Sequence, residues 1–286
     1  MRDSSQIMDI VLTSAKEEPD IRAVFQTGSR VNPNVKRDIY QDYDIIYCVK
    51  DPEIFINRED FLEKFGERIF TYFLGPEKEE VGGASFVWTL LLIDGVRIDL
   101  SFYPISKISS LIIENTLINL LMDKDNIIKE LPISSDISYR IDRPTKNIFE
   151  NKCREFFYYS LDIVPYLIRG DMVGSYKVYQ HIISSLNIVL GWLIAEEKEY
   201  KINLGKNNRF ILENIEENFK EAYLRLYQAV DRESYFVALL EALALFRKFG
   251  LTLAERLGYN YPKNLDVSMT RYIREAYQKK DQRRIY

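Results

Sequence analysis

The spacing of apolar and polar residues follows two different patterns, one before and one after about residue 145. In the first part, a short apolar run at 22–27 stops at Gly28-Ser29, and another at 43–49 stops at Asp51-Pro52. Short runs rich in β-branched and aromatic residues and bounded by turn-forming residues predict β-strands. We therefore expect two strands here, each followed by a turn.

The same part of the chain predicts a β-hairpin, a loop and three helices. The runs 86–93 and 96–103 are separated only by Asp94-Gly95, and an Asp-Gly pair between two such runs strongly favours a hairpin. Polar and turn-forming residues dominate 31–41, which predicts a loop. Helices are expected at 4–18, 58–73 and 107–121.

After residue 145 the strand-like runs disappear, and apolar residues recur with the period of an α-helix. Asp142-Arg143-Pro144-Thr145 predicts a linker, because proline disfavours helix in the residue before it and fits the first turn of a following helix. We expect an α+β chain with two domains: residues 1–142, a small mixed sheet with helices, and residues 143–286, an all-α helical bundle. The bundle helices are predicted at 146–168, 174–197, 208–229, 233–257 and 267–279.

Composition disfavours several classes of protein. The 286-residue chain has no run of about 18 apolar residues and no leader-like N-terminus, so neither a membrane-spanning nor a secreted protein is expected. Two cysteines, Cys48 and Cys153, cannot form a disulfide framework and fit a cytoplasmic location. The single histidine, His181, excludes a multi-histidine zinc site and is interpreted as a helix residue rather than a catalytic base.

Charge is divided unevenly between the two parts. Residues 1–142 hold 16 Lys and Arg against 25 Asp and Glu, whereas residues 143–286 hold 23 against 18. A protein that binds duplex DNA usually has a high pI, and this pI is about 5.4. The pattern disfavours nucleic acid as a partner and suggests that the acidic first domain works with divalent cations. Two domains with ordinary charged surfaces are the simpler alternative.

Three carboxylates are the candidate chemistry of the first domain. Asp42 and Asp44 open the second predicted strand, and residues two apart in a strand point to the same face. Asp99 lies between Ile98 and Leu100 in the second arm of the predicted hairpin, from where it could join the pair. Magnesium binds one or two carboxylates together with phosphate oxygens and water, so this pattern predicts a magnesium–nucleotide site.

The turn after the first strand adds a candidate phosphate site. Gly28 allows a close backbone approach, and the Ser29 hydroxyl with the following amides could hold a phosphate at a helix N-terminus. Alone, a Gly-Ser pair is usually a turn, and an Asp-x-Asp motif is usually a solvated loop end. Their joint order, with a third acid on a hairpin strand, favours a functional site.

This order resembles the nucleotidyltransferase superfamily typified by DNA polymerase beta, and the chain further resembles the aminoglycoside 6-adenylyltransferases, which modify streptomycin. The similarity extends from about residue 5 to residue 277. The stretches that carry it are 28–30 (GSR), 41–45 (QDYDI), 97–100 (RIDL), 123–125 (DKD), 143–145 (RPT), 205–207 (GKN) and 244–248 (ALFRK).

The resemblance implies an N-terminal nucleotidyltransferase domain, a C-terminal helical domain and a substrate held between them. It implies transfer of AMP from ATP, the co-substrate, to a hydroxyl of streptomycin, with Mg²⁺ as cofactor and pyrophosphate as product. Asp42 and Asp44 would be magnesium ligands, and Asp99 would be a metal ligand, the general base or both. The nucleotide-binding residues would be Gly28, Ser29, Arg30 and Lys206.

The chain departs from the family pattern where the acceptor should bind. Streptomycin is a polycation, so its pocket needs carboxylates from the second domain. Gln180, just before His181, stands where the family has an acid. Glu155 and Asp162 are the remaining candidate acids, so the substrate-binding candidates are Glu155, Asp162 and Gln180.

Other interpretations keep the fold and change the function. The acceptor could be a lincosamide or a metabolite, or the protein could bind a nucleotide without catalysis. The three intact acids argue against pure binding. No membrane partner is expected, and both a monomer and a homodimer fit the sequence.

Overall fold

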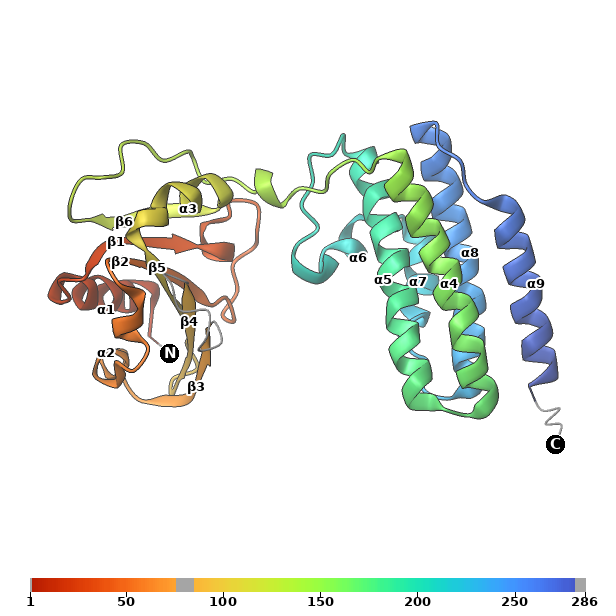
Figure 1. Cartoon of the computed structure of the whole chain (residues 1–286), viewed down its shortest axis with the longest axis horizontal. Helices are drawn as coiled ribbons and strands as arrows, with labels where there is room; N and C mark the ends of the chain where they lie inside the picture. The colour runs from red at the N-terminus through yellow and green to blue at the C-terminus, as the bar shows by residue number, and fades with distance from the viewer. Residues whose placement is uncertain (1, 76–84, 281–286) are drawn as a thin grey trace. The chain divides into compact units, whose positions relative to one another are not determined.

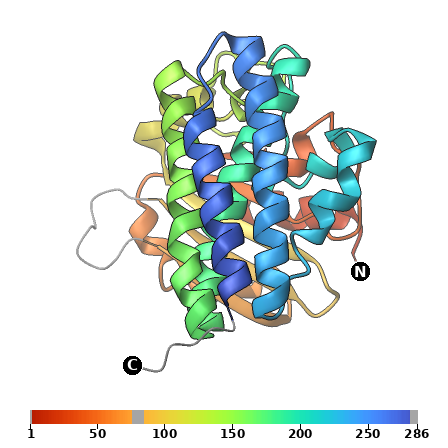
Figure 2. The ribbon, with the colours of Figure 1, turned by 90° about the vertical axis from the view of Figure 1, so that its right-hand side faces the viewer.

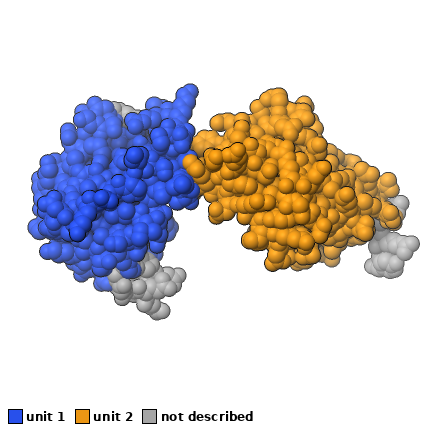
Figure 3. Space-filling view, turned by 90° about the horizontal axis from the view of Figure 1, so that it is seen from above, with its two compact units in different colours: residues 1–138 blue, residues 139–286 orange. Residues whose placement is uncertain are grey.

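The computed structural model describes residues 2–75 and 85–280 (Figure 1). The chain divides into two compact units, residues 1–138 and residues 139–286 (Figure 3), whereas the sequence places the domain boundary between 142 and 143. Each unit has its own hydrophobic core.

The first unit is built on a six-stranded sheet with strand order β3-β4-β5-β2-β1-β6. Only β2 and β5 pair in parallel, and the other neighbours are antiparallel, so the sheet is mixed. The predicted hairpin is confirmed as β4 and β5. The strands are β1 (Ile21–Thr27), β2 (Tyr43–Val49), β3 (Arg68–Leu74), β4 (Phe86–Leu92), β5 (Arg97–Pro104) and β6 (Ile118–Asp123).

Helices cover both faces of this sheet (Figure 1). On one face, α1 (Ser4–Glu17) and α2 (Glu59–Glu63) pack against the odd-numbered residues of β2, and the Tyr47 hydroxyl donates a hydrogen bond of 3.1 Å to the Val11 carbonyl. On the other face, α3 (Ile108–Glu114) packs its Leu111 with Ile46 of β2. Because strand residues alternate in direction, Asp44 lies on the α3 side of the sheet.

The helix predicted at 58–73 is wrong over most of its length. Helix α2 covers only Glu59–Glu63, and Gly66 follows with a positive φ of 100° that a helix interior does not allow. The next residues, Arg68–Leu74, alternate β-branched and aromatic side chains and pair with β4 as an edge strand. Pairing with a distant strand therefore decides the structure of this segment.

The helix predicted at 107–121 is correct only in its first half. Helix α3 ends at Glu114, and Asn115 is extended. The chain then forms β6, which pairs antiparallel with β1 along the edge that β2 leaves open. Backbone hydrogen bonds to β1 replace the helical ones that the apolar run could have made.

The second unit contains only helices in the part that the structure describes, as predicted. Helices α4, α8 and α9 lie side by side (Figure 2), and Phe156 of α4 stacks on Phe246 of α8 with ring centroids 3.7 Å apart. Together with the mixed sheet, this bundle confirms the predicted fold class. The helices are α4 (Lys146–Arg169), α5 (Met172–Glu197), α6 (Ile211–Asn214), α7 (Glu217–Arg225), α8 (Arg232–Leu257) and α9 (Lys263–Lys279).

Polar N-caps fix where the three long core helices begin. The Thr145 side chain accepts a hydrogen bond from the backbone of Ile148 at the start of α4, and the predicted linker ends there. Asp171 and Asp231 cap α5 and α8 in the same way. Each cap satisfies an amide that the first helical turn would leave without a partner.

Helix α5 is long and apolar enough to cross a membrane by length and composition. Within the second unit, however, 67% of its most apolar window is buried, mainly against α4 and α8. A helix that is apolar on most sides and enclosed by other helices is expected at the centre of a bundle. The apolar character of α5 is therefore explained by packing.

Candidate active site

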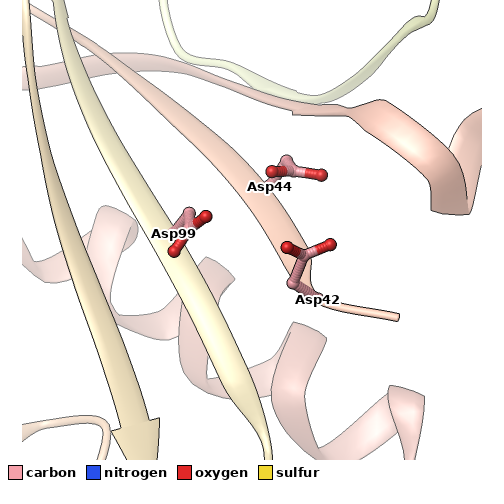
Figure 4. A group of neighbouring side chains, drawn as sticks. All are labelled: Asp42, Asp44 and Asp99. Carbon is pink, nitrogen blue, oxygen red and sulfur yellow. The ribbon is translucent and has the colours of Figure 1, made fainter. Parts of the chain in front are cut away.

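Asp42, Asp44 and Asp99 converge at one end of the parallel strand pair in the first unit (Figure 4). One oxygen from each carboxylate lies within 4.8 Å of those of the other two, and all three side chains are half-buried. The structure therefore brings together the three acids that the sequence singled out. Their chemical roles stay predictions.

Strand register explains this convergence. Asp44 of β2 lies directly opposite Asp99 of β5, and residues opposite one another in a sheet point to the same face. Asp42 comes two residues before Asp44, immediately ahead of β2, and shares that face. The antiparallel hairpin of β4 and β5 puts β5 beside β2 and so delivers Asp99.

Gly28 makes room for Asp44. It follows β1 with φ +75°, and a Cβ added there would lie 2.0 Å from the Asp44 Oδ2 atom. No side chain fits at that distance, and an L-residue also disfavours a positive φ. The Gly-Ser turn therefore holds the Asp44 carboxylate close against the backbone.

The turn after β1 forms a four-residue 3₁₀ helix, Gly28–Val31, at the place where the sequence suggested a helix N-terminus. The predicted phosphate site therefore has little support from a helix dipole, which builds up over several turns. The Ser29 hydroxyl makes no hydrogen bond within residues 2–75 and 85–280. It remains available to a ligand.

Arg30 holds the chain that leads to the carboxylates. Its Nε donates to the Asp42 carbonyl at 2.9 Å, and its Nη2 donates to the Gln41 carbonyl at 2.7 Å. The guanidinium carbon also lies 3.6 Å from the centroid of the Tyr43 ring. Arg30 therefore positions the 41–43 segment, and its predicted place beside the triphosphate stays a prediction.

Arg97 is a component of the site to which sequence reasoning gave no role. Its Nη2 donates to Asp99 Oδ2 at 2.7 Å, and its Nε lies 3.9 Å from Asp42 Oδ2. The hydrogen bond to Asp99 is the main reason that the pKa of the Arg97 guanidinium is raised. A signal was present, since Arg97 precedes Asp99 by two residues on the same strand face.

The three carboxylates suit a divalent cation of the magnesium type. They supply hard oxygen ligands from two strands, which Mg²⁺ prefers over nitrogen or sulfur. The position of the Arg97 guanidinium between Asp42 and Asp99 shows that the group accommodates positive charge. The residues therefore fit a divalent metal ion.

Comparison with known proteins identifies the family. A family profile described as "Streptomycin adenylyltransferase" matches residues 1–276. The chain belongs to this family. It is 32% identical over 277 residues to an aminoglycoside 6-adenylyltransferase of Campylobacter jejuni, covering 96% of this chain and 95% of that protein. It is 33% identical over 283 residues to the protein of the same name from Bacillus subtilis, covering 97% and 99%.

The chain is also similar to a protein of solved structure whose name resembles those of the two relatives. The crystal structure of an aminoglycoside 6-adenyltransferase from Bacillus subtilis matches with 29% identity and a TM-score of 0.48, covering 97% of this chain and 99% of that one. Membership of the streptomycin adenylyltransferase family establishes that the chain is a nucleotidyltransferase, as predicted.

The remaining predicted site residues of this nucleotidyltransferase lie in its second unit. Lys206 is exposed in a short 3₁₀ turn after Gly205. Glu155 of α4 is paired with Lys152 at 2.7 Å. Asp162, also on α4, is half-buried, and Gln180 is exposed on α5. Their parts in nucleotide or acceptor binding stay predictions.

Proposed function

We propose that this enzyme transfers AMP from ATP to a hydroxyl group of an aminoglycoside, with a streptomycin-type acceptor and Mg²⁺ as cofactor. The convergence of Asp42, Asp44 and Asp99 beside the Gly28 turn is the observation that carries the proposal. The relatives named aminoglycoside 6-adenylyltransferase support the class of acceptor. Attachment of AMP to the drug would give antibiotic resistance.

In the proposed reaction, the acceptor hydroxyl oxygen attacks the α-phosphorus of ATP. A new phosphorus–oxygen bond forms to the acceptor, and the bond from the α-phosphorus to the oxygen that bridges it to the β-phosphorus breaks. Pyrophosphate leaves, and the hydroxyl proton passes to the Asp99 carboxylate. Positioning and neutralisation of charge supply most of the catalysis in such transfers.

Each carboxylate has a defined place in this scheme. Asp42 and Asp44 would hold Mg²⁺, which supplies charge neutralisation for the phosphates and the leaving pyrophosphate. Asp99 faces them from β5 and acts as the general base. Its orientation is fixed by the two hydrogen bonds from Arg97, so the carboxylate is preorganised toward its neighbours.

The turn after β1 would receive the nucleotide. Gly28 leaves no side chain between the backbone and Asp44, and the Ser29 hydroxyl has no partner among the described residues. Phosphate oxygens would accept hydrogen bonds from that hydroxyl and from backbone amides of the turn. Lys206, which is exposed in its turn of the helical unit, stays a candidate for binding the nucleotide.

Acceptor recognition is assigned to the helical unit, where a polycation needs carboxylates. Asp162 makes no ion pair with any described residue, whereas Glu155 is already bound to Lys152 and accepts a 3.4 Å hydrogen bond from Ser185. Asp162 is therefore the stronger of the two candidates. Three residues before it, Tyr159 stacks on His181 with ring centroids 4.5 Å apart and adds an aromatic surface.

The test is release of pyrophosphate from ATP in the presence of magnesium and streptomycin. We expect release that depends on streptomycin in the wild-type enzyme and that is lost in Asp44→Asn. The matched control is Asp9→Asn, which makes the same change of charge at an exposed position on α1 and should leave the rate unchanged.

Each other outcome has a definite meaning. Magnesium-dependent ATP binding without release would refute streptomycin as the acceptor and direct the search to lincosamides or metabolites. Full release in Asp44→Asn would refute the role of the carboxylates. Absence of ATP binding would refute the proposed site as a whole.

A further inference from the structure

Strands β4 and β3 continue the sheet beyond β5 (Figure 1) and extend the face that carries the carboxylates. Asp44 of β2 lies opposite Asp99 of β5, and Asp99 lies opposite Thr89 of β4. Thr89 lies opposite Tyr72 of β3. Because residues opposite one another in a sheet point to the same face, Thr89 and Tyr72 share a face with the two carboxylates. Neighbouring strands lie about 4.8 Å apart, so Tyr72 lies about 10 Å from Asp99.

The part of this face on β3 and β4 is apolar and open. Phe70, Tyr72 and Leu74 of β3 are 52%, 52% and 60% exposed. Their neighbours Leu91 and Val87 of β4, opposite Phe70 and Leu74, are half-buried. None of these five residues packs against a hydrophobic core cluster in the described part of the chain. Edge strands usually avoid such an apolar surface, and an exposed apolar patch marks a binding site.

Two hydroxyl groups lie within this apolar surface. The hydroxyls of Tyr72 and Thr89 make no hydrogen bond with any residue in 2–75 or 85–280. The Tyr72 ring lies nearly parallel to the Phe70 ring, with centroids 6.2 Å apart and planes within 11°. The surface therefore combines aromatic rings with groups that both donate and accept hydrogen bonds. A sugar ring, with apolar C–H faces and hydroxyl groups at its rim, matches this combination.

The six positions that β3 and β4 contribute to this face carry no charge. They are Phe70, Tyr72, Leu74, Val87, Thr89 and Leu91. The charged residue of β3, Arg68, is paired with Glu59 of α2, on the other face of the sheet. An ammonium or guanidinium group bound over these six positions would lose water without gaining a counter-charge. The surface therefore suits a neutral ring.

The sheet order assigns this surface to the acceptor rather than to the nucleotide. The Gly28–Ser29 turn, where the phosphates are proposed to bind, follows β1, and β1 and β4 lie on opposite sides of the β2–β5 pair. Asp99, the proposed base, belongs to β5 and is the carboxylate next to β4. The acceptor hydroxyl must approach this base. The rest of the acceptor then extends over Thr89 and Tyr72.

We propose that Thr89, Tyr72 and Phe70 form an acceptor subsite that binds a neutral, hydroxyl-bearing ring of the aminoglycoside. The inference rests on the proposed function and specifies how its acceptor is held. The ring that receives AMP lies over Thr89, beside Asp99, and a second ring lies over Tyr72 and Phe70. The separation of about 10 Å between Asp99 and Tyr72 leaves room for both rings.

The test replaces Tyr72 with valine, which removes the ring and the hydroxyl but keeps a residue that favours a strand. Calorimetry measures streptomycin binding in the presence of magnesium and α,β-methylene ATP, an analogue that cannot release pyrophosphate. We expect the Kd for streptomycin to rise at least about tenfold, and the Kd for the analogue to stay within about twofold. Tyr72→Phe, which lacks only the hydroxyl, should raise the Kd for streptomycin about threefold.

Thr71→Val is the matched control, because it puts the same residue at the neighbouring position of β3. Thr71 lies opposite Leu90, which belongs to the core cluster on the other face of the sheet. This variant should bind streptomycin as the wild type does. An equal loss of affinity in Thr71→Val and Tyr72→Val would show a structural role of the strand and would overturn the inference.

The remaining outcomes separate the subsite from the proposed reaction. If the wild type binds streptomycin but releases no pyrophosphate from ATP, the reaction fails, and weaker binding by Tyr72→Val still supports the subsite. An unchanged affinity of Tyr72→Val for streptomycin would overturn the inference. With that affinity unchanged, weaker binding of the analogue would assign the surface to the nucleotide, and a change in oligomeric state on gel filtration would assign it to a second copy of the chain. No streptomycin binding by the wild type would overturn both the subsite and streptomycin as the acceptor.

Discussion

Replacement of Gly28 by alanine tests the link between the turn and the carboxylates. The new Cβ would lie 2.0 Å from Asp44 Oδ2, whereas contacts under 3.0 Å are almost never seen, so the oxygen must move by about 1 Å. A misplacement of about 1 Å in a catalytic group can lower a rate about a hundredfold. We therefore expect kcat/KM to fall by about that factor.

The same substitution also affects stability through the backbone. Gly28 has φ +75°, and an L-residue in this region costs about 1–2 kcal/mol. Gly258→Ala is a matched control, because Gly258 has φ +71° and a Cβ there would meet nothing within 4 Å. Both variants should lose this backbone contribution in chemical denaturation, and Gly28→Ala should lose more because its Cβ also overlaps Asp44.

Pyrophosphate release is the assay that distinguishes the two glycine variants. Gly258→Ala should keep the wild-type kcat/KM, since its added methyl group contacts nothing, whereas Gly28→Ala should lose most of it. If both variants retain the wild-type rate while losing the same stability, the close approach of Gly28 to Asp44 has no part in catalysis. That result would refute the reasoning.

Three further predictions concern other parts of the molecule. Asp99→Asn should abolish transfer and largely spare ATP binding, as measured by pyrophosphate release and calorimetry; unchanged turnover would remove Asp99 from the mechanism. Asp266→Asn should destabilise the chain by about 2 kcal/mol in urea denaturation, because the 2%-exposed carboxylate accepts two hydrogen bonds from Arg247. A loss below about 0.5 kcal/mol would contradict this. Burial raises the pKa of Cys48 and Cys153 to about 12, so both thiols should stay protonated and resist alkylation at pH 8 until the protein unfolds; rapid alkylation of the native protein would be inconsistent with the structure.

Local sequence patterns predicted the parts of the fold that depend on local signals. Turn or cap residues in the neighbouring sequence mark three such parts: the strands β1 and β2, the Asp94-Gly95 hairpin and the capped helices. The errors at 58–73 and 107–121 arose where an edge strand forms by pairing with a strand distant in sequence. Apolar runs there fit a helix or a strand equally well, and only the partner decides.

The candidate site also contains residues that local sequence patterns predict and contacts that only the folded structure reveals. Asp42 and Asp44 could be paired from the two-residue period of a strand, and Asp99 from its place between two apolar neighbours. The contact of Arg97 with Asp99 could be expected from the same two-residue period, since both lie on one face of β5. Its approach to Asp42 depends on the parallel register of β2 with β5, which no short motif encodes.

The most direct test of the central claim uses ATP with an isotope label on one phosphate and measures which product carries that label. In a single turnover with streptomycin and magnesium, ATP labelled at the α-phosphate should transfer its label to the acceptor, and ATP labelled at the γ-phosphate should yield labelled pyrophosphate. Asp44→Asn should do neither. Label from the γ-phosphate on the acceptor would show phosphoryl transfer instead and would contradict the account.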